Sequence, residues 1–145
     1  GYNVRNLHDE IAKILKIDKV HPMIIVGAGH LGLALANYTN FRKRGFDIKG
    51  VFDRNPEVIG QDAGGVKVSP MSEMGALVQK EGIRLAALCI PKEAAVEIVD
   101  ELISYGVDGF WNFAHVDLEV PKNIVVENVH LSESLMRLSY RVFED

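Results

Sequence analysis

The chain has 145 residues, 48% of them hydrophobic and 25% charged, which suits one globular domain with a sizeable core. Its net charge of −4 gives no general attraction for nucleic acid or for an anionic membrane. The chain has no apolar run of membrane-spanning length and no signal-peptide pattern. The single cysteine, Cys89, excludes an internal disulfide and fits a reducing cytoplasm.

The first predicted element is an amphipathic helix near the start of the chain. Its apolar side chains recur at spacings of three and four residues, at Val4, Leu7, Ile11, Ile14 and Leu15. A connector follows at 17–22, because the residue before a proline disfavours helix. We therefore expect residues 1–20 to form a linker helix ahead of a domain that occupies 21–145.

A strand, a glycine-rich turn and a helix come next. Residues 23–26 are Met-Ile-Ile-Val, and residues 27–32 are Gly-Ala-Gly-His-Leu-Gly. A helix is expected from about residue 31 to residue 44, and a second strand over 47–52 leads to Asp53. A strand, glycine turn, helix, strand and acid in this order are typical of a dinucleotide-binding unit.

Each glycine of this turn has a predicted task. Gly27 permits the tight turn, Gly29 admits a pyrophosphate close to the backbone, and Gly32 lets the helix pack closely. The N-terminus of the helix directs free N–H groups at the phosphates. Asp53 stands near the expected spacing of about 20 residues for an acid that binds ribose hydroxyls. The alternative is a tight turn that binds nothing, with Asp53 capping the end of a strand.

The rest of the chain continues the alternation of strands and helices. Strands are expected at 66–68, 85–90, 109–113 and 124–126. Helices are expected from a cap at Ser72 to Gly82, from Pro91 to residue 105, and from residue 131 or 132 to the end of the chain. This order predicts an α/β fold of the doubly wound, Rossmann-like class: a mostly parallel sheet with helices on both faces.

Ligands of such sheets bind beyond the carboxyl ends of the strands. Ile90 and Pro91 end one central strand, and Asn112, Phe113 and Ala114 end the next. Asn112 is therefore a candidate for hydrogen bonds to a nicotinamide carboxamide. Phe113 either lines the nicotinamide pocket or belongs to the core.

The segment that follows the last strand is unusually apolar for a terminal helix. One stripe carries Leu131, Leu135, Leu138 and Val142. Such a stripe must be buried. It packs either on its own domain or on a second subunit.

Several of these segments resemble the NAD(H)-binding domain of Rex, a family of bacterial redox-sensing transcriptional repressors. The match extends over nearly the whole chain. It is carried by 1–4 (Gly-Tyr-Asn-Val) with Leu7, 25–32, 34–38 (Ala-Leu-Ala-Asn-Tyr), 44–46 (Arg-Gly-Phe), Phe52-Asp53, Ile90-Pro91, Ala94-Ala95, 111–114 (Trp-Asn-Phe-Ala), Asn128-Val129, Leu131, Leu135 and 138–140 (Leu-Ser-Tyr).

The resemblance implies a homodimer that releases DNA when NADH rises, with its C-terminal helix, here 130–145, exchanged between subunits. DNA would be bound only by a winged-helix domain that this chain lacks. The resemblance also implies NADH/NAD⁺ as cofactor and no catalytic residue. No metal site is expected, because the five histidines show no metal-ligand spacing and no cysteine pair supports them. The expected cofactor-binding residues are Gly27, Ala28, Gly29, His30, Leu31, Gly32, Asp53, Arg54, Ile90, Pro91, Asn112, Phe113 and Ala114.

The chain departs from the family pattern at three histidines. His30 replaces an asparagine in the glycine turn, and His115 replaces a proline after the Asn-Phe-Ala segment. His130 replaces an aspartate that the family uses in its conformational switch. Pyrophosphate binding should survive, because backbone N–H groups provide it.

Two other functions remain open from the sequence. One is a fragment of an NAD-dependent dehydrogenase, for which His115 is the only candidate base near the pocket. The other is a coenzyme A-binding domain of the same layout. Asp53 disfavours the extra phosphate of NADP or of coenzyme A, whereas Arg54 could neutralise it.

Overall fold

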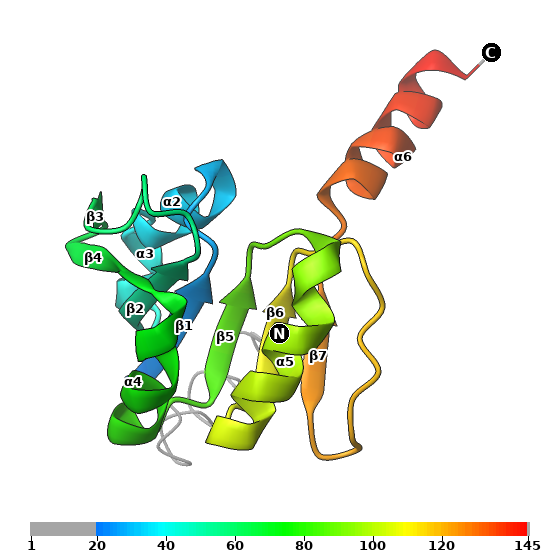
Figure 1. Ribbon diagram of the computed structural model, residues 1–145. Helices are drawn as coiled ribbons and strands as arrows, with labels where there is room; N and C mark the ends of the chain where they lie inside the picture. Colours follow the sequence, from blue (N-terminus) through cyan, green and yellow to red (C-terminus); the bar gives the residue numbers. More distant parts are fainter. Residues whose placement is uncertain (1–19, 145) are drawn as a thin grey trace, which may run out of the picture.

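The computed structural model describes residues 20–144, and the predicted linker helix over 4–16 lies outside the described residues. A seven-stranded sheet in the order β3-β4-β2-β1-β5-β6-β7 forms the centre of the domain (Figure 1). All neighbouring strands are parallel except β3, which pairs antiparallel with β4. The predicted α/β fold with a mostly parallel sheet is confirmed.

The strands follow the predicted positions with small shifts at their ends. Their bounds are β1 His21–Val26, β2 Phe46–Asp53, β3 Asp62–Ala63, β4 Val66–Pro70, β5 Leu85–Leu88, β6 Gly109–Asn112 and β7 Val125–Asn128. The short strand β3 was not predicted from the sequence. Strand β5 ends at Leu88, two residues before the predicted end, so Cys89 and Ile90 belong to the loop at the ligand edge.

The helices differ more from the prediction. They are α2 His30–Ala36, α3 Asn40–Lys43, α4 Met74–Glu81, α5 Lys92–Tyr105 and α6 Leu131–Phe143, with a 3-10 turn η1 at Met71–Glu73. The predicted cap at Ser72 is wrong, because that residue lies inside the 3-10 turn. The predicted ends at Gly82 and Gly106 are correct, and both glycines adopt the left-handed conformation that favours glycine.

The single helix predicted over 31–44 is two short helices. The side-chain amide of Asn37 donates to the carbonyl oxygen of Leu33 at 2.8 Å, at the point where α2 ends. A short polar side chain that bonds to the backbone in this way competes with helix continuation. The chain turns there and resumes as α3, beside β2.

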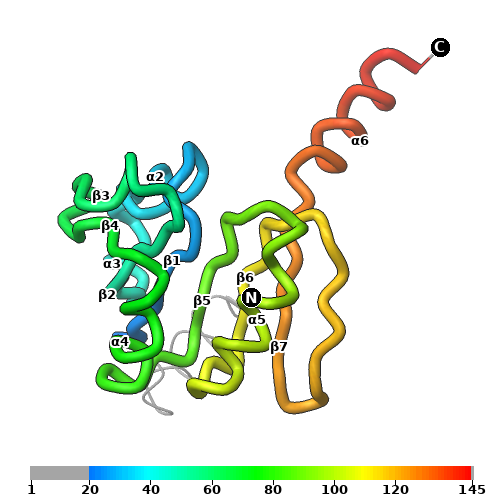
Figure 2. The backbone as a smooth tube through the Cα atoms, viewed as in Figure 1, coloured from blue at the N-terminus to red at the C-terminus, as the bar shows by residue number. Residues whose placement is uncertain are grey.

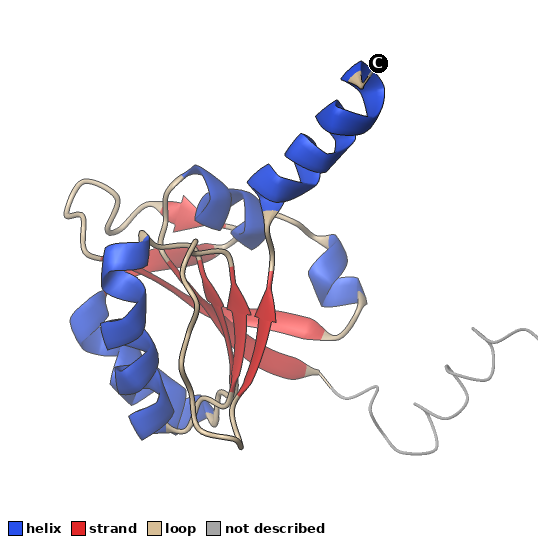
Figure 3. Cartoon of the chain, turned by 90° about the vertical axis from the view of Figure 1, so that its right-hand side faces the viewer, coloured by secondary structure: helices blue, strands red, loops and turns tan. Residues whose placement is uncertain are grey.

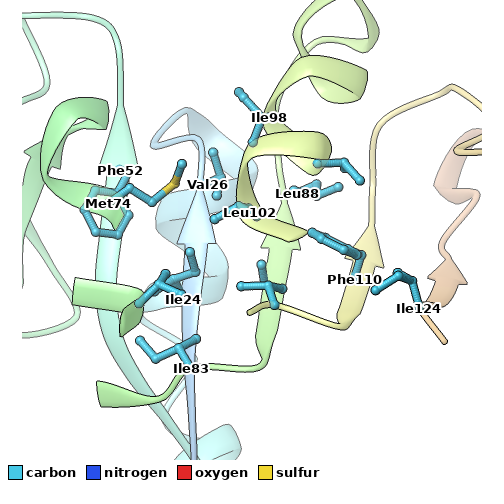
Figure 4. Close-up of a cluster of buried hydrophobic side chains, with 14 residues drawn as sticks. Ile24, Val26, Phe52, Met74, Ile83, Leu88, Ile98, Leu102, Phe110 and Ile124 are labelled. Carbon is cyan, nitrogen blue, oxygen red and sulfur yellow. The ribbon is translucent and has the colours of Figure 1, made fainter. Parts of the chain in front are cut away.

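Alternation along the strands divides the core between the two faces of the sheet. Ile24, Val26 and Leu88 pack with α4 and α5 on one face (Figure 4). Met23, Ile25 and Ala87 point to the other face, together with side chains of α2. Figure 3, turned by 90° from Figure 1, shows the sheet from its side with helices on either side of it. The helices therefore cover both faces around β1 and β2, as predicted.

Helix α6 is the exception to this packing. It leaves the carboxyl edge of the sheet after β7 and extends away from the domain (Figures 1 and 2). None of its described residues is buried. Its exposed apolar side chains are Leu131, Leu135, Met136, Leu138, Tyr140, Val142 and Phe143. Packing of this helix on its own domain, one of the two sequence alternatives, is not seen.

Candidate functional site

The site lies where the strand order reverses. After β1 the chain passes to β2 and β4 on one side, and after β4 it returns to β5 on the other side of β1. The loops that follow β1 and β5 therefore diverge and leave a crevice at their carboxyl ends. Two backbone bonds hold this edge together: Gly27 donates to Phe52 at 2.7 Å, and Cys89 donates to Val26 at 2.8 Å.

Two of the three glycines are required by the fold itself. Gly27 has φ of 104°, and a Cβ there would lie 2.1 Å from the carbonyl oxygen of Cys89. A Cβ on Gly32 would lie 1.8 Å from the carbonyl oxygen of Gly27. Both contacts involve backbone atoms, so any side chain at either position displaces the turn. The predicted tasks of Gly27 and Gly32 are thus seen in the geometry.

Gly29 is different. Its φ is −76°, a value that any residue adopts, and no atom of the described chain lies within 4 Å of a Cβ built there. No contact among the described residues requires the side chain to be absent. The free space lies beside the start of α2, where backbone N–H groups have no helical acceptor. This is the position at which a pyrophosphate approaches the backbone in dinucleotide-binding folds.

The carboxylate of Asp53 organises the turn. One oxygen accepts the backbone N–H of Ala28 at 2.6 Å, and the other accepts the backbone N–H of Asn55 at 2.8 Å. The first bond ties the end of β2 to the glycine turn after β1. Each oxygen retains a lone pair, so the carboxylate can also accept ribose hydroxyls. The capping alternative and the ribose role are therefore compatible.

Three further predicted residues border this turn. Arg54 is largely exposed, and its guanidinium lies 3.9 Å from the carboxylate of Glu97. Such an exposed pair is weak, so the guanidinium is free to turn toward a phosphate. His30 and Leu31 are the first residues of α2, and the His30 side chain is exposed.

The loops after β5 and β6 supply the other predicted residues. Ile90 is half-buried, and Pro91 precedes α5 and accepts the N–H of Ala94 at 3.0 Å. Phe113 is half-buried and lies edge-on to Trp111, with ring centroids 4.7 Å apart. The structure thus brings both loops to the same edge as the glycine turn, because β5 and β6 are neighbours.

Asn112 has a role that the sequence did not reveal. Its amide donates to the carbonyl oxygen of Val116 at 3.1 Å and to Oδ1 of Asn128 at 2.9 Å, while its oxygen accepts from Ala114 at 3.0 Å. The side chain is 1% exposed. Both amide hydrogens are thus already donated, and none remains for a carboxamide. Asn112 therefore stabilises the loop after β6 and its contact with the end of β7.

Cys89 lies just behind the glycine turn. Burial raises the pKa of its thiol to about 12, so the group stays protonated and poorly nucleophilic at neutral pH. A Cβ on Gly32 would lie 3.6 Å from the Cβ of Cys89, which places the thiol against the base of the turn. This environment is that of a packing residue.

The fold and the turn define a Rossmann-type α/β domain of the dinucleotide-binding class. In agreement, the family described as "CoA binding domain" matches residues 18–116. More specific relatives exist. The chain is 48% identical over 144 residues to the redox-sensing transcriptional repressor Rex of Clostridioides difficile, covering 99% of this chain and 69% of that protein. The chain belongs to the Rex family of redox-sensing transcriptional repressors.

Solved structures give the same result. RSP, a Rex-family repressor, is 44% identical, with a TM-score of 0.88, and the match covers 99% of this chain and 69% of that one. RSP was also solved with NADH, and with NAD⁺ and operator DNA. A second curated Rex, from Caldanaerobacter subterraneus, is 45% identical, and the chain spans 65% of its length. The chain thus spans about two thirds of these relatives.

Proposed function

We propose that this chain is the NADH/NAD⁺-sensing domain of a Rex-type repressor, binding NADH to control the release of DNA by a winged-helix domain outside these residues. The observation that carries the proposal is the space at Gly29. It is open and lies beside free N–H groups at the reversal of strand order. The neighbouring residue Ala28 donates its N–H to the carboxylate of Asp53. The proposal agrees with the NADH and NAD⁺ complexes of RSP.

Charge explains how such a site can sense redox state. The oxidised nicotinamide ring is positively charged, and the reduced ring is neutral. Placing an unpaired charge in an apolar pocket is costly. The half-buried Ile90 and Phe113 stand at the edge where the ring would lie. A tenfold preference for NADH needs only about 1.4 kcal/mol.

Calorimetric titration with NADH, NAD⁺, NADPH and coenzyme A tests this function. We expect NADH to bind most tightly and NADPH to bind weakly, because Asp53 repels a 2′-phosphate. Equal affinities for NADH and NAD⁺ would remove the sensing role. Turnover of NADH with small carbonyl compounds would instead support the dehydrogenase alternative.

We further propose that α6 mediates homodimerisation. Its exposed leucine stripe has no partner among residues 20–144, and an apolar helix projecting into water is unfavourable. A second copy of the chain can bury this stripe by exchanging helices. Light scattering after size exclusion should show a dimer, and Leu135→Glu should yield a monomer. The matched control is Arg137→Glu, which introduces the same carboxylate on the helix without removing an apolar side chain.

The remaining placements follow the same proposal. Residues 1–20 would link the sensing domain to the DNA-binding part, and the repressor would work in the cytoplasm as a regulator without catalytic activity. Among the described residues, no helix is long and apolar enough to cross a membrane.

A second candidate ligand is coenzyme A, because the matching family is described as a CoA-binding domain. Asp53 argues against it, since the 3′-phosphate of coenzyme A would approach a carboxylate. Exposed Arg54 argues the other way. Competition between coenzyme A and NADH distinguishes the two. Displacement of NADH at similar concentrations of coenzyme A would favour the second candidate.

A further inference from the structure

One ion pair joins the two halves of the sheet at the ligand edge. Arg54 directly follows β2, and Glu97 lies in the second turn of α5, the helix that comes after β5. Strand β1, with its glycine turn, lies between β2 and β5. The guanidinium of Arg54 is 3.9 Å from the carboxylate of Glu97. Among the ion pairs within residues 20–144, this is the one that links the β1–β4 half to the β5–β7 half.

The place of Arg54 in the chain relates this pair to the choice of ligand. The carboxylate of the preceding residue, Asp53, is fixed at the end of β2 by the N–H groups of Ala28 and Asn55. In dinucleotide-binding folds an acid at this place accepts the ribose hydroxyls, and a nearby arginine accommodates the 2′-phosphate that distinguishes NADP from NAD. The planar fork of donors on a guanidinium matches phosphate oxygens. Arg54 is therefore the residue with the chemistry to accept NADPH.

Glu97 competes for the same guanidinium. A phosphate and the Glu97 carboxylate would bind the same N–H donors, so a guanidinium that turns to the phosphate loses its contact with Glu97. The two side chains are 62% and 85% exposed, and water and salt therefore keep the pair weak. Such a pair biases the direction of Arg54 without fixing it. Its effect on a competing ligand is about two- to fivefold in affinity.

We propose that Glu97 is a specificity-determining residue, which weakens the binding of NADPH by pairing with Arg54 and leaves the binding of NADH unchanged. The inference rests on the proposed function, because it concerns the adenosine end of the same dinucleotide. Asp53 repels the 2′-phosphate, and Glu97 engages the cation that would offset this repulsion. The opposing effects of Asp53 and Arg54 on an extra phosphate are thus decided by a residue of the other half of the sheet.

Titration of the complete chain with NADH, and competition of NADPH against bound NADH, test this role. Glu97→Gln should strengthen NADPH binding about two- to fivefold and leave the NADH dissociation constant within about 1.5-fold of the wild type. Glu101→Gln is the matched control, because it removes the same charge one turn further along α5. Glutamine there can still accept the hydrogen bond from Tyr105. The control should change neither affinity, and equal NADPH affinities of the wild type and Glu97→Gln would overturn the proposal.

A double-mutant cycle separates pairing with Arg54 from direct repulsion of the phosphate. Arg54→Gln should weaken NADPH binding, and in that background Glu97→Gln should have no further effect on it. If Glu97→Gln still strengthened NADPH binding by the same factor, Glu97 would act directly on the phosphate and the role through Arg54 would be wrong.

The same titrations distinguish the two proposals of this chain's function. A wild type that binds NADH, with unchanged NADPH affinity in Glu97→Gln, refutes the specificity role and leaves the sensing function standing. A wild type that does not bind NADH refutes both.

Discussion

Replacement of Gly29 by alanine separates a requirement of the ligand from a requirement of the fold. The backbone at Gly29 is compatible with alanine, and the added Cβ meets no atom within 4 Å. Loss of glycine entropy in the unfolded state should stabilise the variant by about 0.4–1 kcal/mol. Alanine is a poorer N-cap than glycine, which costs a similar amount. The two effects nearly cancel, so the melting temperature should change by less than about 4 °C.

Ligand binding should respond much more strongly. The Cβ fills the space through which a pyrophosphate reaches the backbone, so we expect at least tenfold weaker NADH binding, or about 1.4 kcal/mol. Calorimetry gives the affinity, and thermal unfolding gives the stability. Gly32→Ala is the matched contrast: its Cβ would lie 1.8 Å from the carbonyl oxygen of Gly27, so it should unfold at a clearly lower temperature. A Gly29→Ala protein with wild-type affinity would refute the reasoning.

Other measurements test the neighbouring residues. Asp53→Asn has one acceptor oxygen for two backbone N–H groups, so denaturation should show a loss of about 1–3 kcal/mol of stability. Because the variant also lacks the negative charge that repels a 2′-phosphate, titration should show a smaller difference between the affinities for NADPH and NADH. Asn112→Leu leaves three polar groups unpaired, so the free energy of unfolding should fall by more than about 3 kcal/mol. The folded fraction should bind NADH with nearly unchanged affinity. A loss of NADH affinity without a loss of stability would instead support a hydrogen bond from Asn112 to the carboxamide. The raised pKa of Cys89 implies that the unfolded chain releases this proton first as pH rises from about 9 to about 12, so stability falls with rising pH there. This thiol contributes a fall of up to about 1.4 kcal/mol per pH unit in the free energy of unfolding, and Cys89→Ala should lack it in chemical denaturation. If the free energy of unfolding changed equally with pH in the wild type and in Cys89→Ala, the reasoning would be wrong.

The glycine turn shows how far local pattern reaches. Backbone conformation at a turn depends on the residues within it, so the spacing of Gly27, Gly29 and Gly32 predicted the turn and its place between strand and helix. Helix ends at Gly82 and Gly106 were predictable for the same reason. The break at Asn37 was not, because a side chain that competes for a carbonyl can equally point into solvent.

The contacts of Asn112 show where local pattern stops. Asn128 lies sixteen residues away, and only the register between β6 and β7 places the two amides together. Asp53 reaches Ala28 through the pairing of β1 with β2 in the same way. A sequence can indicate that such residues are polar and stand at strand ends. It does not indicate whether their hydrogen bonds go to a ligand or to the protein.

The sequence by itself therefore determined the fold class, the glycine turn with its acid, and the apolar character of α6, since all three depend on local spacing or periodicity. The tertiary structure alone decided that Gly29 faces open space among the described residues and that Asn112 is fully bonded within the protein. These features depend on which distant segments meet, and strand order and register set those meetings.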